Sequence, residues 1–325
     1  MKLFRAWYPE AYQGTHRKKG YFEGWYLKLI DSPGKTIFAL IPGVSTGRSR
    51  NDAHAFIQLI NAVTGKTEYF RFALEAFSAD DRKFDVRIGS NHFWDGGMQV
   101  NLQNETTSLS GSLRFEQIEK YPTSLLHPGI MGPFSFIPWM ECYHGVVNIS
   151  HTIVGSLMYN GGALDMTGGE GYIEKDWGKS FPKSWIWMQA NHFSTPKASF
   201  MFSLARIPWL GTTFTGLICF LRTDLGFFRF ATYNGAKVCE LVTEGNQIKA
   251  TLKNPTHTLA FTATYTSGGI LKAPKNGMML RDIEESITAQ VTVDLLDAQG
   301  NVLFHDASNR VGMEIAGDPA RLLTR

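Results

Sequence analysis

Residues 171–193, with the sequence GYIEKDWGKSFPKSWIWMQANHF, place the carboxylates Glu174 and Asp176 among aromatic side chains. The tryptophans of this window are Trp177, Trp185 and Trp187. Burying a carboxylate beside aromatic rings is costly unless the group is paired or protonated. A carboxyl group that stays protonated near neutral pH is a proton donor, so the window indicates acid chemistry.

Side-chain alternation predicts which of these residues meet. If residues 171–177 form a strand, Tyr172, Glu174 and Asp176 share one face, because side chains alternate along a strand. The same argument applied to residues 184–193 groups the following polar and aromatic side chains: Trp185, Trp187, Gln189 and Asn191.

Residues 21–30 supply a second strand of this kind. Glu23 and Trp25 share one face, on which Glu23 is the only carboxylate, and Tyr26 lies on the other. An apolar pocket with a few polar groups suits a hydrophobic ligand with one polar head. The alternative is that the tryptophans are simply core residues. The predicted catalytic residues are Glu174, Glu23 and Asp176, and the predicted substrate-binding residues are Trp25, Tyr26, Trp177, Trp185, Trp187, Gln189 and Asn191.

Short β-branched or aromatic runs between turn dipeptides predict an antiparallel all-β fold with few short helices. Asn160-Gly161 and Asn234-Gly235 are the strongest hairpin signals, because both residue types tolerate the positive φ of a type I′ turn. Asp318, followed by Pro319, predicts the N-cap of one short terminal helix. Further expected turns are Thr64-Gly65, Gly245-Asn246 and Gln299-Gly300. The expected strands include segments at 21–30, 36–44, 54–62, 199–207, 214–222, 258–266 and 286–296.

The alternation lapses at residues 116–140, whose prolines oppose regular strand pairing. We expect this apolar segment to connect two β domains, at residues 1–140 and 141–325, and to pack against a groove or barrel mouth. A chain of 325 residues is also compatible with one large β structure.

Composition excludes several classes of function. A net charge of +3 is too small to indicate nucleic-acid binding. The first residues, MKLFRAWYPEAYQG, carry no signal-peptide pattern, and no apolar stretch approaches the ~18 residues of a membrane span. We therefore expect a cytoplasmic protein without a transmembrane segment, and leave peripheral membrane contact open. Cys142, Cys219 and Cys239 are too far apart to suggest a disulfide framework or a thiolate zinc site.

The histidines do not predict a metal centre. Glu141 and His144 have the spacing of a helical metal pair, but Pro138 makes a helix there unfavourable. His144 and His151 are therefore interpreted as a strand residue and a satisfied polar contact. No P-loop, nucleophile elbow or dinucleotide motif is present in the sequence, so we expect no metal and no cofactor.

Four segments resemble the tocopherol cyclase family of plants and cyanobacteria and its bacterial relatives. They are FEGWY at 22–26, the window from EKDWG onward at 174–193, LKAPKNGMMLRDIEESITAQVTVDL at 271–295, and SNRVGMEIAGD at 308–318. The resemblance implies two lipocalin-like β domains, distantly similar to carotenoid hydratases. It also implies an isomerase-type, intramolecular cyclase that acts on a prenylated hydroquinone.

The same resemblance separates the two acids of the window. Plant cyclases have EKNWG where this chain has EKDWG, and the hydratase counterpart looks like DHEWS, so Glu174 is favoured over Asp176 as the acid. Ring closure would begin with protonation of a prenyl alkene, after which the phenol oxygen captures the tertiary cation. Aromatic faces would stabilise that cation, and exclusion of water would prevent hydration. The alternatives are an isoprenoid hydratase and a non-catalytic carrier of a hydrophobic ligand.

Overall fold

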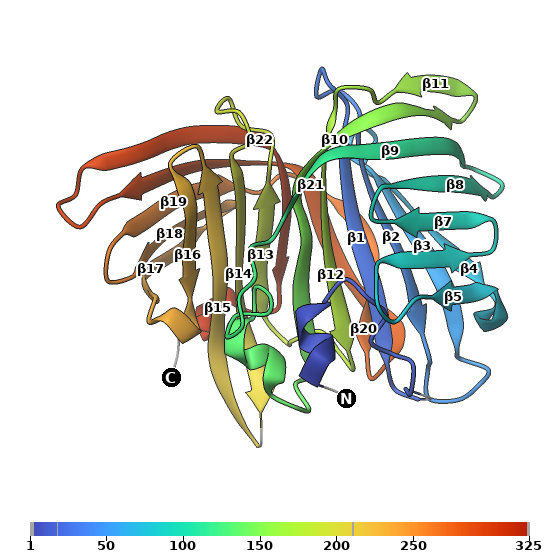
Figure 1. Cartoon of the computed structure of the whole chain (residues 1–325), viewed down its shortest axis with the longest axis horizontal. Coiled ribbons are helices and arrows are strands. Elements are labelled where there is room, and N and C mark those ends of the chain that lie inside the picture. The colour runs from blue at the N-terminus through green and yellow to red at the C-terminus, as the bar shows by residue number, and fades with distance from the viewer. Residues whose placement is uncertain (1–2, 18, 210, 324–325) are drawn as a thin grey trace. The chain divides into compact units, whose positions relative to one another are not determined.

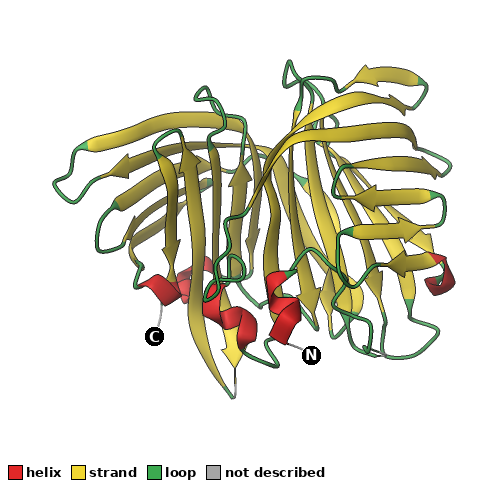
Figure 2. Ribbon diagram, viewed as in Figure 1, coloured by secondary structure: helices red, strands yellow, loops and turns green. Residues whose placement is uncertain are grey.

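The computed structural model describes residues 3–17, 19–209 and 211–323, and within these ranges its regular secondary structure is almost entirely β-strand (Figures 1 and 2). Residues 1 and 2 of the stretch considered for a signal peptide lie outside these ranges. The described helices are all short 3-10 helices. They are η1 (Leu3–Trp7), η2 (Leu74–Ala76), η3 (Gly132–Phe136), η4 (Thr232–Asn234) and η5 (Pro319–Leu322). The expected all-β fold is confirmed.

The first sheet has twelve antiparallel strands in the order β4-β3-β2-β1-β12-β10-β9-β8-β7-β6-β5, with β11 paired to β10. The strands are β1 (Phe22–Ile30), β2 (Ile37–Ser45), β3 (His54–Asn61), β4 (Lys66–Phe72), β5 (Phe77–Ala79), β6 (Asp85–Ile88), β7 (Asn91–Trp94), β8 (Gly97–Gln103), β9 (Ser108–Lys120), β10 (Cys142–Tyr159), β11 (Gly162–Asp165) and β12 (Glu170–Gly178). The sheet curls around its own hydrophobic core, to which Trp25, Leu27 and Leu29 of β1 contribute.

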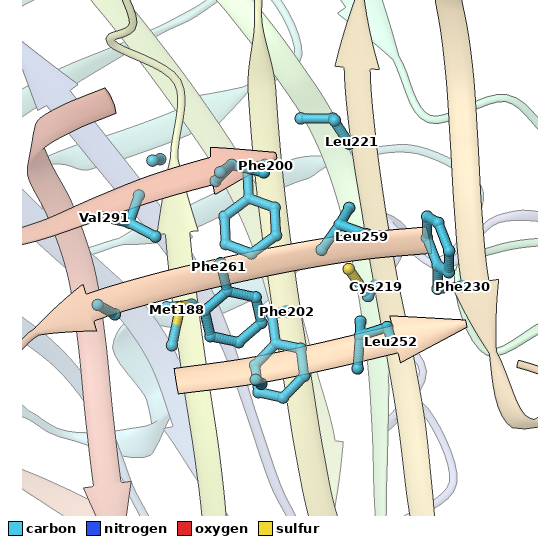
Figure 3. Packing of buried hydrophobic residues seen from close by; sticks show 14 of the residues in the cluster. Met188, Phe200, Phe202, Cys219, Leu221, Phe230, Leu252, Leu259, Phe261 and Val291 are labelled. Carbon is cyan, nitrogen blue, oxygen red and sulfur yellow. The ribbon is translucent and has the colours of Figure 1, made fainter. Parts of the chain in front are cut away.

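The second sheet has ten strands in the order β16-β15-β14-β13-β22-β21-β19-β18-β17, with β20 paired to β21. The strands are β13 (Trp185–Ala190), β14 (Ser199–Trp209), β15 (Thr212–Thr223), β16 (Gly226–Ala231), β17 (Lys237–Glu244), β18 (Gln247–Lys253), β19 (Thr258–Thr264), β20 (Gly269–Lys275), β21 (Met278–Leu296) and β22 (Val302–Ala316). Its core contains alternate residues such as Phe200 and Phe202 of β14, which pack against Phe261 of β19 (Figure 3).

The chain divides into two compact units. The first comprises residues 1–181 with 270–282, and the second comprises 182–269 with 283–325. The ranges 1–140 and 141–325 expected from the sequence differ from this division. The reason is that β10, β11 and β12 follow residue 140 and yet pair within the first sheet. The proline-containing segment connects β9 to β10, which are neighbours in that sheet.

Most of the expected local structure is confirmed. Asn160 and Gly161 have φ values of 49° and 81° and form the two-residue turn between β10 and β11. Asp318 accepts a hydrogen bond from the backbone of Ala320 and caps η5. The seven segments expected as strands correspond to β1, β2, β3, β14, β15, β19 and β21.

The hairpin expected at Asn234-Gly235 is wrong. These residues end η4, with Gly235 at a φ of 80°, and they lie between β16 and β17. Those two strands stand at opposite ends of the strand order in the second sheet. A turn dipeptide specifies how the chain reverses locally, but not whether the flanking strands pair.

Candidate functional site

Three neighbouring strands, β1, β12 and β10, carry the predicted acids of the first unit. Tyr26 of β1 pairs with Glu174 of β12, and His144 of β10 pairs with Asp176 of β12. Directly paired residues in an antiparallel sheet project to the same face. These residues therefore share one face with Tyr172, which we call the acid face. The opposite face carries Trp25 and joins the hydrophobic core, so we call it the core face.

On the acid face, the ring of His144 lies against two carboxylates. Its Nδ1 is 3.0 Å from Oδ1 of Asp176, and its Nε2 is 3.4 Å from Oε2 of Glu174. The Tyr172 hydroxyl donates a hydrogen bond of 2.7 Å to the same oxygen of Glu174. Tyr172 and Glu174 are buried. We refer to His144, Tyr172, Glu174 and Asp176 as the His–carboxylate cluster.

The charges of this cluster keep a proton on the imidazole. Burial alone would lower the pKa of His144, but the negative charges of Glu174 and Asp176, and hydrogen bonds to them, raise that pKa to about 10. Burial and the charge of Glu174 also raise the pKa of the Tyr172 hydroxyl well above its usual value. At neutral pH the cluster therefore contains a protonated His144 imidazole between the side chains of Glu174 and Asp176, and a tyrosine that keeps its proton.

Glu23 lies on the core face and has different partners. It forms an ion pair of 2.5 Å with Lys175, and both side chains are completely buried. The backbone N–H of Gln13 donates to both carboxylate oxygens of Glu23, at 2.9 and 3.0 Å, and the Tyr21 hydroxyl donates to one of them. Burial lowers the pKa of Lys175, while the charge of Glu23 opposes that shift. The two predicted acids, Glu23 and Glu174, therefore occupy opposite faces of the sheet.

Two of the predicted binding tryptophans accompany Glu23 and not Glu174. The ammonium of Lys175 lies 4.8 Å from the ring centroid of Trp25 and 4.7 Å from that of Trp177, within cation–π distance. Trp177 also stacks on Tyr143, with 5.6 Å between ring centroids. Of the predicted binding residues in the first unit, Tyr26 alone shares the acid face with Glu174.

The second unit contains the other predicted binding residues. In β13, Ile186 and Met188 point into the core of that unit, so Trp185, Trp187 and Gln189 lie on the opposite face. On that face, the indole Nε1 of Trp185 donates a hydrogen bond of 2.7 Å to Glu314, and the Gln189 amide donates one of 3.3 Å to Asn191. Glu314 is paired across the sheet with Trp187 on one side and with Glu285 on the other. The role of these residues in substrate binding stays a prediction.

Sequence reasoning missed His144 and Glu314 as site residues. His144 lies 32 positions before Asp176, and only the β10–β12 register brings the two together. Glu314 lies within the segment SNRVGMEIAGD that carried the family resemblance. Alternation along β22 places Glu314 and Gly312 on one face, and this was the only signal for Glu314 in the sequence.

The cluster could also hold a metal ion. One ligand atom each from His144, Glu174 and Asp176 lies within 4.8 Å of the others, and these are residue types that bind zinc. Sequence spacing indicates metal pairs only within one segment, whereas these three residues come from two strands, β10 and β12. A surface depression of about 570 Å³ lies elsewhere in the first unit, and no residue of the His–carboxylate cluster lines it. Its lining residues are Tyr12, Thr15, Ala79, Asp80, Asp81 and Arg82.

The chain is similar to known proteins in sequence and in fold. It is 25% identical to the chloroplastic tocopherol cyclase of Zea mays over 95% of this chain and 77% of that protein. It is 22% identical to the probable chloroplastic tocopherol cyclase of Oryza sativa subsp. japonica over the same shares. The crystal structure of CghA covers 92% of this chain and 89% of its own, with a TM-score of 0.55 at 10% identity, and shows the shared fold.

The family assignment rests on the match to a family model. The family model described as tocopherol cyclase-like matches residues 118–317, which is more than half of the chain and includes the whole of β12 and β13. Together with the two plant relatives, this match indicates a related enzyme. No described helix has the length and apolar character needed to cross a membrane. The chain belongs to the tocopherol cyclase-like family.

Proposed function

We propose that the protein is a cofactor-free cyclase of a prenylated hydroquinone, and that the His–carboxylate cluster supplies and recovers the proton. The observation that carries this proposal is the position of His144, 3.0 Å from Asp176 and 3.4 Å from Glu174, with a pKa raised to about 10. The cluster thus stores a proton at neutral pH beside a carboxylate. The family to which the chain belongs supports this class of reaction and a hydrophobic small-molecule substrate.

Glu174 is the proposed proton donor. An alkene is a weak base, so the donor must be a neutral carboxylic acid when the alkene lies beside it. Exclusion of water by the bound substrate disfavours the charged pair of imidazolium and carboxylate. The proton then moves from His144 Nε2 to Glu174, which gives a neutral imidazole and a carboxylic acid. Asp176 holds Nδ1 of His144 and thereby orients the ring.

The reaction is an isomerisation in which every atom is retained. Glu174 gives its proton to the less substituted carbon of the alkene, and a tertiary cation forms on the neighbouring carbon. The phenol oxygen bonds to that carbon, and the phenol proton returns to the Glu174 carboxylate. Tyr26 and Tyr172 present aromatic rings on the same face as Glu174, where such rings stabilise a cation. Glu23, Trp25 and Trp177 have no step in this proposal, because they lie on the core face.

The test uses a hydroquinone with a trisubstituted prenyl chain, kept reduced and incubated with purified protein in D₂O. We expect a ring-closed product of unchanged formula that carries one non-exchangeable deuterium on carbon. Glu174→Gln should abolish turnover. Glu170→Gln is the matched control, because Glu170 lies on the same strand and face, two alternations away.

Two outcomes would contradict the proposal. A product heavier by one water would show that the cation is captured by water, which is hydratase chemistry. Recovery of unchanged hydroquinone that co-purifies equally with wild type and Glu174→Gln would indicate a carrier.

A further inference from the structure

The segment between β9 and β10 exposes large apolar side chains. Leu125, Leu126 and Trp139 are 80%, 70% and 81% exposed, respectively. All three lie in irregular chain on either side of η3. Isolated exposed apolar residues are ordinary, but neighbouring ones of this size mark an interaction surface.

The N-terminal helix brings further aromatic surface to this segment. Trp7 of η1 donates a hydrogen bond of 3.3 Å from its indole to the carbonyl of Ser124 and lies 5.0 Å from the ring of Phe136 in η3. The two 3-10 helices therefore lie side by side (Figure 1). The next residue, Tyr8, is 48% exposed. We define Tyr8, Leu125, Leu126 and Trp139 as the apolar rim.

The backbone holds Trp139 outward in an unusual conformation. Its φ is 62°, in the left-handed region that bulky residues rarely adopt. The Tyr143 hydroxyl donates a hydrogen bond of 2.7 Å to the carbonyl of Ile137 and fixes the chain two residues before Trp139. Strain of this kind persists where the surrounding structure enforces it, and it concentrates at functional positions.

Exposed cations border the apolar rim. Arg17 interacts electrostatically with Tyr143, whose pKa is raised chiefly by burial, and Lys19 follows two residues later. The backbone N–H of Lys179 donates 2.8 Å to the carbonyl of Glu141, two residues after Trp139. The side chains of Arg17, Lys19 and Lys179 are all exposed. A tryptophan and leucines flanked by Lys and Arg are typical of surfaces that enter a bilayer interface.

We propose that the apolar rim binds the surface of a lipid bilayer that contains anionic lipids. Four side chains in loops offer far less area than the roughly 800 Å² per partner of a stable protein interface, but they suffice for an interfacial anchor. The purpose of this membrane binding rests on the proposed function. A prenylated hydroquinone dissolves in bilayers, and the apolar rim would bring the enzyme to it.

The experiment is co-sedimentation with vesicles of phosphatidylcholine and phosphatidylglycerol, without substrate. The test variant replaces Leu125, Leu126 and Trp139 by Ser, and the control is Leu225→Ser, because Leu225 is 58% exposed in the β15–β16 turn. We expect wild type and control to bind and the triple variant to partition more than about tenfold less. Arg17→Gln combined with Lys19→Gln and Lys179→Gln should remove the preference over pure phosphatidylcholine and make binding insensitive to salt.

The proposal is overturned if the triple variant binds as wild type does, or if wild type binds neither vesicle. It is also overturned if the triple substitution converts a dimer to a monomer in sedimentation, since the rim would then join two copies of the chain. Thermal melting checks that the triple variant is folded. Its turnover of a short-chain, water-soluble hydroquinone should equal that of wild type. Vesicle binding without turnover would reject the proposed function and leave the anchor standing.

Discussion

The two faces of β12 present neighbouring residues in opposite roles. Lys175 and Glu23, on the core face, form a completely buried ion pair whose charged atoms also contact backbone groups. Glu174, one residue away on the acid face, accepts a hydrogen bond from Tyr172 and lies 3.4 Å from Nε2 of His144. The difference lies in the partner. The Lys175 ammonium is held by Glu23 and by a backbone carbonyl on the core face, whereas the His144 imidazole lies against the carboxyl groups of Glu174 and Asp176 on the acid face. Burial of a carboxylate is therefore insufficient to identify an acid catalyst.

The largest effect should come from Glu174→Gln on the acid face. This change keeps the shape and the hydrogen bond from Tyr172 but removes the group that carries the proton. We expect turnover of a prenylated hydroquinone to fall by about 10²–10⁴-fold. The free energy of unfolding at neutral pH should fall only in part, because Asp176 still holds the His144 imidazole after the charge of Glu174 is lost. Steady-state kinetics and urea unfolding of the same preparation measure both. Glu23→Gln should show the reverse pattern, and equal losses of turnover in the two variants would contradict the comparison.

Among substitutions on the core face, Lys175→Met should lower the free energy of unfolding the most. It leaves Glu23 buried without its cationic partner, which typically costs about 3–5 kcal/mol. Urea unfolding followed by tryptophan fluorescence measures the loss. The double variant Glu23→Gln with Lys175→Met should recover part of it, because the unpaired charge is then gone. A single variant as stable as wild type would show that the pair contributes nothing to the fold.

His144 should make stability depend on pH in the alkaline range. Its pKa is about 10 in the folded protein against 6.5 for the model group, so the folded state binds this proton more tightly. The resulting stabilisation is complete below pH 6.5 and is lost as the pH rises towards 10. We expect a loss of roughly 2–4 kcal/mol over that window. His144→Gln should flatten this part of the profile of unfolding free energy against pH, and an unchanged slope would contradict the charged imidazole.

His151, on the same strand, should act in the opposite direction and more weakly. It is buried on the core face against Phe115, and burial lowers its pKa to about 3. Neither ring nitrogen has a hydrogen-bond partner among the described residues. The unfolded state therefore takes up the proton first as the pH falls below 6.5, and stability should drop by roughly 2 kcal/mol by about pH 5. Unfolding midpoints of His151→Leu across this range should lack that drop.

The strands and most turns could be predicted from local pattern, because alternation and turn residues act over a few positions. The grouping of Tyr172, Glu174 and Asp176 on one face followed from the same rule. That Glu23 and Glu174 lie on opposite faces of the sheet did not follow from this rule, because it depends on the register between β1 and β12. Glu23 pairs with Trp177, so it shares that residue's face and not the face of Glu174.

The partnership of His144 with the acids was also beyond local pattern. The β10–β12 pairing that aligns His144 with Asp176 includes register shifts at Asn148 and beyond. No sequence rule of fixed period locates such bulges. The Asn234-Gly235 turn failed for a related reason, since strand order in the second sheet is set by contacts far apart in the chain.

The buried Lys175 also limits what can be changed at residues 9–13. Its ammonium donates to the backbone carbonyls of Pro9 and Ala11, while Gln13 holds Glu23. These contacts use backbone groups and not side chains, although Ala11 is itself completely buried. Removing the segment would expose two charges and open one end of the core. Engineers who shorten or circularly permute this protein should therefore keep these five residues.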